Sequence, residues 1–162
     1  MSESKIKNFF SNLKFKKVIW LAPLLYLIHF LEELFGGFWI FLNDYQGANH
    51  TALSFTLVNV GIMIAYLVII GVFTKWPNRS TAFIALTWLA TAQFFNAFAH
   101  LHYTIVYNVY NPGLITAFVL YVPYVPILFW IAYREEYTTK TLAVVSLVLG
   151  AIFMTLVHIF IG

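Results

Sequence analysis

Hydrophobic residues dominate the chain in five long runs, and short polar segments separate these runs. Each run has roughly 20 to 27 residues, and about 20 apolar residues suffice for an α-helix to cross the hydrocarbon core of a membrane. The pattern therefore predicts five membrane-spanning helices, over residues 18–42, 51–73, 81–107, 113–133 and 141–161. Because the linkers are short, we expect antiparallel neighbouring helices in a single all-α bundle.

The composition supports the prediction of membrane-spanning helices and indicates the class of protein. The 162 residues are 62% hydrophobic and 9% charged, whereas about 25% of residues are charged in ordinary soluble domains. The sequence thus predicts a multi-pass integral membrane protein, and we expect it in the bacterial cytoplasmic membrane. Residues 1–17 are predicted to form a basic cytoplasmic or interfacial arm, and residues 18–162 the transmembrane domain. The absence of cysteine excludes disulfides and thiolate chemistry.

The basic residues predict the orientation in the membrane. All nine lie in the N-terminal arm or in two alternate linkers, at Lys75, Arg79, Arg134 and Lys140. The positive-inside rule places such segments in the cytoplasm. We therefore expect the N-terminus inside and the C-terminus outside. The net charge of +3 then reflects topology, and no nucleic-acid partner is expected.

Three ionisable side chains interrupt the first run near its middle: His29, Glu32 and Glu33. An acidic residue at that depth costs about 2.5–3.5 kcal/mol on insertion scales, so a charged group there requires a local reason. Residues three and four apart share one face of a helix. A histidine and a carboxylate in this arrangement can bind a metal, or act as a base and its orienting partner. A buried hydrogen-bonded pair that only stabilises helix packing is the structural alternative.

A second polar stripe lies in the third run, where Gln93, Asn96 and His100 recur on one helical face. Such a stripe normally faces the protein interior. His102 is turned about 200° from His100 on a helix of 3.6 residues per turn, so we expect only His100 to point inward. Asn59 and His158 are expected to make hydrogen bonds between helices rather than to bind a ligand.

The segment from Tyr110 to Thr116 opens the fourth run with a proline and a glycine. The free N–H groups at this helix start would stabilise an anion in the outer half of the membrane. Pro123 and Pro126 are expected to bend the same helix near its middle.

These motifs resemble those of the HXXEE family of small integral membrane proteins. The namesake motif corresponds to the segment from His29 to Glu33. The family's N-x-x-x-H motif corresponds to Asn96 through His100, and its Y-x-P-G motif to Tyr110 through Gly113, with Thr116 as the hydroxyl residue that follows. The resemblance covers nearly the whole chain and implies an enzyme without indicating its substrate.

We interpret the sequence as a membrane-embedded enzyme that acts on a lipid or another apolar molecule, reached through the outer leaflet. In the favoured version it is a hydrolase in which His29, Glu33 and His100 bind a divalent metal, zinc or iron. The second glutamate, Glu32, is then the general base for a bound water. The candidate catalytic residues are Glu32, Glu33, Asn96 and Thr116.

Three alternatives remain open at this level. In a metal-free enzyme, the two glutamates would share a proton and act with the histidines as acid and base, for example in isomerising a sterol-like or isoprenoid substrate. Buried glutamate and histidine also occur in proton and cation transporters. A transporter of this size would need to form a homo-oligomer, because the chain shows no inverted repeat. The last alternative is a binding or immunity-type membrane protein without chemistry.

Overall fold

A computed structural model describes residues 12–161, and this part of the chain contains helices and no strand. Five helical stretches are long and apolar enough to cross a membrane, so the all-α class and the five predicted spans are confirmed. The architecture is that of a multi-pass membrane protein. The spans are Phe15–Gly36, Ala52–Lys75, Arg79–Tyr107, Leu114–Arg134 and, in the last helix, Lys140–Ile159.

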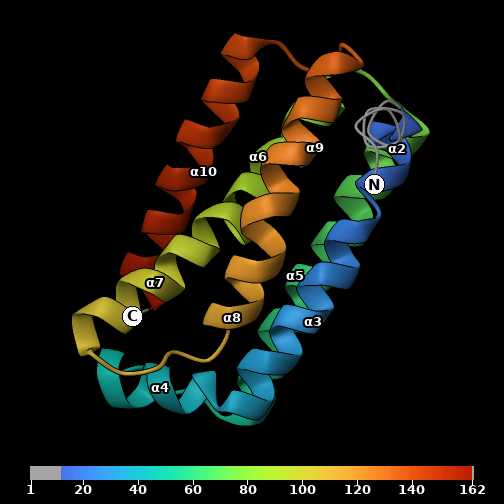
Figure 1. Cartoon of the computed structure of the whole chain (residues 1–162). Helices are drawn as coiled ribbons and strands as arrows, with labels where there is room; N and C mark the ends of the chain where they lie inside the picture. The colour runs from blue at the N-terminus through green and yellow to red at the C-terminus, as the bar shows by residue number, and fades with distance from the viewer. Residues whose placement is uncertain (1–11, 162) are drawn as a thin grey trace, which may run out of the picture.

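Figure 1 shows these spans as an elongated bundle, with the start of the first span and the end of the last span at opposite ends. The first span contains α2 (Phe15–Val18) and α3 (Leu21–Gly36), and the second is α5 (Ala52–Lys75). The third contains α6 (Arg79–Leu89), the π-helical segment η1 (Ala90–Phe95) and α7 (Asn96–Tyr107). The fourth contains α8 (Leu114–Thr116), the π-helical segment η2 (Ala117–Tyr121) and α9 (Val122–Arg134), and the fifth is α10 (Lys140–Ile161).

The first predicted helix is too long at its C-terminal end. It ends at Gly36, because Gly37 adopts a left-handed conformation with φ of 77° that side chains disfavour and glycine accepts. The remaining residues form a separate helix, α4 (Phe38–Gln46), which lies across one end of the bundle in Figure 1. Glu33 therefore lies in the last turn of α3, about 27 Å from Phe15 at 1.5 Å per residue. The predicted position near the middle of the span is wrong for this reason.

Both helices that carry the later motifs contain a π-helical segment. The wider turn η1 directly precedes Asn96, and η2 directly follows Thr116. Short π-helical turns inside α-helices occur frequently at functional sites. Pro123 and Pro126 follow η2 and lack the N–H groups that would bond to residues one turn earlier. The π-helical segment begins at Ala117, six residues before the first proline, and the predicted bend at the prolines stays a prediction.

Small residues and paired polar groups hold the spans together. Gly150 of α10 packs so closely on η1 that a Cβ atom added to it would lie 2.6 Å from Cβ of Ala90. Tyr26 of α3 donates a 2.5 Å hydrogen bond to Oδ1 of Asn59 in α5. Asn59 thus makes the bond between helices that the sequence predicted. In a membrane such contacts replace the hydrophobic effect as the force between helices.

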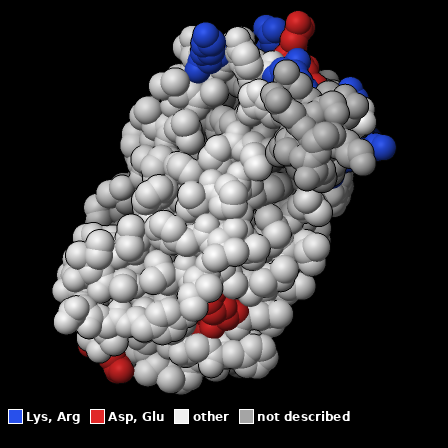
Figure 2. All heavy atoms as spheres, in the orientation of Figure 1, with Lys and Arg blue, Asp and Glu red and all other residues white. Residues whose placement is uncertain are grey.

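The surface has the distribution of charge expected for a bundle in a membrane. Figure 2 shows lysine and arginine gathered at one end, and the face between the two ends is almost free of charge. The lipid-exposed side of α10 carries Val144, Val148 and Ile152. Of the predicted basic arm, residues 1–11 lie outside the described part, while Phe15 is fully buried at the start of the first span. The orientation of the bundle in the membrane stays a prediction.

Candidate metal centre

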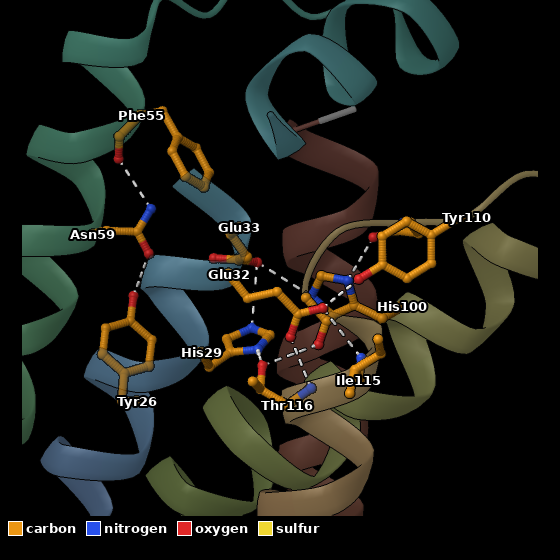
Figure 3. A network of polar contacts seen from close by, with 12 residues as sticks. Tyr26, His29, Glu32, Glu33, Phe55, Asn59, His100, Tyr110, Ile115 and Thr116 are labelled. Atoms are coloured by element: carbon orange, nitrogen blue, oxygen red, sulfur yellow. Dashed lines mark hydrogen bonds and ion pairs between the residues drawn. The ribbon is translucent and has the colours of Figure 1, made fainter. Parts of the chain in front are cut away.

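Three predicted ligands meet at the end of the bundle that α4 covers. His29 and Glu33 come from successive turns of α3, and His100 comes from α7 (Figure 3). Oε1 of Glu33 lies 3.3 Å from Nε2 of His29 and 3.2 Å from Nε2 of His100. One ligand atom from each residue lies within 4.8 Å of the other two. All three side chains are buried, with at most 5% of their surface exposed.

The opposite nitrogen of each histidine ring has its own hydrogen-bond partner. Nδ1 of His100 lies 2.6 Å from Oδ1 of Asn111, an oxygen that can only accept, so this Nδ1 carries the hydrogen. Nδ1 of His29 lies 3.0 Å from Oγ1 of Thr116, whose hydroxyl points to the carbonyl of Gly113 at 3.4 Å. That hydroxyl can therefore accept a hydrogen bond from His29. Both Nε2 atoms face the Glu33 carboxylate. In a neutral ring, Nε2 of His100 is then unprotonated, and Nε2 of His29 is unprotonated in the tautomer whose Nδ1 donates to Thr116.

This arrangement places two nitrogen lone pairs against one carboxylate oxygen in a buried space. Nε2 of His29 makes no hydrogen bond. Lone pairs and a carboxylate repel one another unless a cation lies between them, and burial makes that repulsion stronger. In this protonation state a metal ion or an extra proton between the three groups would stabilise the centre. The same pattern, in which each ligating histidine donates its other N–H to a fixed acceptor, is usual around protein-bound metals.

Gly113 makes the close approach of the fourth span possible. A Cβ atom added there would lie 2.6 Å from Cε1 of His100, 2.9 Å from Cε1 of His29 and 3.0 Å from Cγ of Glu33. Its φ of 101° also favours glycine. One residue earlier, Pro112 packs on Gly36, where an added Cβ would lie 2.6 Å from the proline ring. The loop before α8 thus forms one wall of the centre.

Glu32 points away from the centre, toward the start of α8. Its carboxylate accepts hydrogen bonds from the hydroxyl of Tyr110 at 2.5 Å and from the backbone N–H groups of Ile115 and Thr116 at 3.3 and 2.8 Å (Figure 3). The anion expected at this helix start is therefore a side chain of the protein itself. The two glutamates have different partners, so the predicted proton shared between them has no counterpart among the contacts of the described residues.

Tyr110 lies outside the membrane-spanning segments, and its pKa reflects its hydrogen bond to Glu32. Partial burial and the hydrogen bond to the negative Glu32 raise the pKa of Tyr110 to about 12. The raised pKa follows because the phenolate would be poorly hydrated and repelled by the carboxylate.

A largely apolar cavity of about 370 Å³ opens from the centre into the bundle. Its volume is within the range of small-molecule sites, about 300–1,000 Å³. Asn96 lines it together with the three candidate ligands, and Oδ1 of Asn96 is buried without a hydrogen-bond partner. Asn96 is thus brought to the same cavity as the ligands, as predicted, but it does not belong to the ligand group.

The remaining histidines behave differently from the ligands. His102 is exposed, which confirms that it does not share the inward face of His100. His158 of α10 lines the cavity and stacks on Tyr103, with ring centroids 4.2 Å apart. The contact of His158 is therefore a ring contact, where a hydrogen bond was predicted.

Sequence reasoning missed two residues that position the others. Asn111 is fully buried and orients His100, and Tyr110 holds Glu32. Both lie in the loop motif from Tyr110 to Gly113, and Asn111 occupies its variable second position. The signal that could have indicated Asn111 is its polar side chain beside Pro112 in the turn that precedes the fourth span.

The motifs also agree with a comparison against known families. The family described as "protein of unknown function with HXXEE motif" matches residues 20–128, which include all three motifs and Thr116. The chain belongs to the HXXEE family. No curated protein and no solved structure matches the chain. The HXXEE motif of this chain supplies two of the three candidate ligands, His29 and Glu33, and its remaining glutamate, Glu32, anchors the fourth span.

Proposed function

We propose that this protein is a membrane-embedded metalloenzyme, a hydrolase that acts on a lipid or another apolar substrate. His29, Glu33 and His100 would hold one divalent metal ion, zinc or iron. The observation that carries the proposal is the convergence of two Nε2 atoms on one carboxylate oxygen, with both Nδ1 atoms oriented by Thr116 and Asn111.

The donor set and its dimensions fit such an ion. Catalytic zinc sites often use two histidines and one glutamate and keep a fourth position free. With bonds of about 2.0–2.2 Å, tetrahedral ligand atoms lie roughly 3.3–3.6 Å apart. The two distances from Glu33 Oε1 to the histidine nitrogens, 3.3 and 3.2 Å, are close to that range. The cavity lined by the ligands would supply the free position.

Each neighbouring residue has a role in this proposal. A bound metal would polarise a carbonyl or phosphoryl oxygen and acidify water. Asn96, which lines the cavity and whose buried Oδ1 makes no hydrogen bond, would orient the attacking water or the substrate. Thr116 and Asn111 hold the histidine rings. Glu32 receives a positioning role in place of the predicted base, because its carboxylate is occupied by Tyr110 and the backbone of α8.

The surroundings of the centre support an apolar substrate. The cavity is lined mainly by apolar side chains, and the bundle around it is built to lie in lipid. Glu33 lies in the last turn of α3, and Figures 1 and 2 together show that α3 ends at the end of the bundle opposite the basic residues. With the basic end in the cytoplasm, the centre would lie in the outer leaflet, near the depth at which lipid chains join their headgroups.

The shared oxygen of Glu33 also favours one metal-free alternative. A proton between Glu33 and either histidine would satisfy the same 3.2 and 3.3 Å contacts. The group would then act as an acid and base on an isoprenoid or sterol-like substrate.

Turnover of an extracted lipid mixture tests the proposal. We expect the parent protein to hydrolyse a lipid, and we expect chelator to abolish the reaction until zinc or iron is restored. His100→Ala should be inactive, whereas His102→Ala, an exposed histidine on the same helix, should retain activity. Activity that resists chelator but is lost in His100→Ala would support the acid–base alternative. Full turnover in Glu33→Gln would contradict both enzyme proposals and favour transport.

A further inference from the structure

A second apolar space lies on the lipid-facing side of the bundle, between α5 and α10. It is a groove of about 740 Å³ whose floor is α6 and whose sides include Ile69 of α5 and Leu149 and Phe153 of α10. Along α6 and the start of η1 it extends from Phe83 to Thr91, which is about 12 Å of helix. Both flanking helices pack on α6, and both expose apolar side chains along most of their length.

The groove adjoins the cavity that contains the candidate metal centre. Trp88, Thr91 and Val157 line both spaces, so these three residues form a junction between them. From His100 to Thr91 the third span covers nine residues, about 14 Å. One leaflet of the hydrocarbon core is about 15 Å deep, half of the roughly 30 Å total. A chain with its polar end at His100 and its tail in the cavity would therefore reach the junction and leave through the groove.

We propose that the cavity and the groove together form a lateral channel for one hydrocarbon chain of a membrane lipid. The group to be cleaved would lie at the His29–Glu33–His100 centre, and the tail would pass between α5 and α10 into the bilayer. The identification of this hydrocarbon chain as part of the substrate rests on the proposed function. The binding of a hydrocarbon chain in the channel does not depend on the proposed function.

The shape of the space favours a hydrocarbon chain over a second copy of this protein. A helix from another copy, about 10 Å across, could cover the outer groove, but it could not enter the cavity of about 370 Å³ behind Thr91. A single chain is narrow enough to occupy both. Lipid chains also surround α5 and α10 on the membrane side, so the occupant needs no separate route through water.

Retention of a single-chain lipid, measured by native mass spectrometry, tests this proposal. The protein is loaded with palmitoyl lysophosphatidylcholine in detergent, exchanged into fresh detergent and weighed. We expect the parent to keep one lipid. Val157→Trp and Leu156→Trp place a large ring at the junction and in the groove, on positions 41% exposed, and should lower retention roughly tenfold or more. Val148→Trp adds the same ring to α10 outside both spaces and should behave like the parent.

Metal content and oligomeric state are recorded on the same samples. Unchanged melting temperature and metal content in Val157→Trp, together with lost lipid, would support the channel. Equal retention in all four proteins, or none in the parent, would overturn it. A dimer in the parent that Val157→Trp dissociates would overturn it in favour of an interface between copies. Loss of metal from the parent with lipid retention intact would contradict the proposed chemistry and leave the channel in place.

Discussion

Asn111 determines which nitrogen of His100 is free to face Glu33. Its Oδ1 accepts the Nδ1 hydrogen at 2.6 Å, and the amide is completely buried. Removing such an orienting partner typically lowers metal affinity by about 10–100-fold. We expect that loss in Asn111→Leu, measured by zinc titration against a competing chelator.

A matched change separates this role from packing. Asn111→Asp keeps an acceptor at the same place and should keep affinity near or above the parent value. Equal affinities in Asn111→Leu and the parent, with unchanged melting temperature, would show that Asn111 does not orient the ligand.

Gly113 packs directly against the centre, and it leaves no room there for a side chain. In Gly113→Ala the new Cβ would meet both histidine rings at 2.9 Å or less, and a positive φ adds further strain. We expect stability to fall by about 1–3 kcal/mol and bound metal to fall with it, measured by thermal unfolding in detergent and by metal analysis. Gly61→Ala is the control, because nothing lies within 4 Å of its added Cβ. A fully metal-loaded Gly113→Ala would contradict the packing described.

At the scale of the element, Glu32 joins the first span to the start of the fourth. Glu32→Gln removes the charge that stabilises the α8 N-terminus, at a cost of about 0.5–2 kcal/mol. The same change should lower the pKa of Tyr110 from about 12 toward its ordinary value near 10. The measurement is the difference in phenolate absorbance between the two proteins during an alkaline titration, with thermal unfolding alongside.

The direction of the pH effect follows from the raised pKa of Tyr110. The protonated hydroxyl donates to Glu32, so this contact stabilises the fold below pH 10 and is lost as the pH rises through about 12. Glu32→Gln should remove that alkaline step. An identical alkaline titration in both proteins would show that Tyr110 does not contact Glu32.

The elements also show what sequence reasoning could reach. Hydropathy predicted the five spans, and helical spacing predicted that His29, Glu33 and His100 face the interior of the bundle. Both predictions depend only on the periodicity of polar and apolar residues. The end of α3 at Gly37 was missed, since the residues that follow are as apolar as those before and only the positive φ of one glycine marks the break.

The divergence of the two glutamates could not be predicted either. Adjacent residues point about 100° apart on a helix, and which one faces the interior depends on where the loop before α8 lies. That loop is placed by tertiary packing, through Pro112 on Gly36 and Gly113 on the histidine rings.

For the whole molecule, the charge distribution predicts the orientation in the membrane. The protein has no cysteine, so single cysteines can be introduced without background. Asn78 precedes α6 at the basic end, and Asp44 lies in α4 at the opposite end; both are exposed. With an impermeant thiol reagent on intact cells we expect labelling of Asp44→Cys and protection of Asn78→Cys. The reverse pattern would show that the bundle has the opposite orientation and that the centre lies in the inner leaflet.

The metal content of the purified protein tests the central claim most directly. Elemental analysis after purification without added metal should find about one zinc or iron per chain in the parent and in His102→Ala, as expected for three protein ligands in a buried site. Glu33→Gln and His100→Ala should each lose it while remaining folded. A parent protein without metal, which also fails to bind zinc or iron when either is supplied, would contradict the metal centre. Equal metal in the parent and His100→Ala would contradict its location.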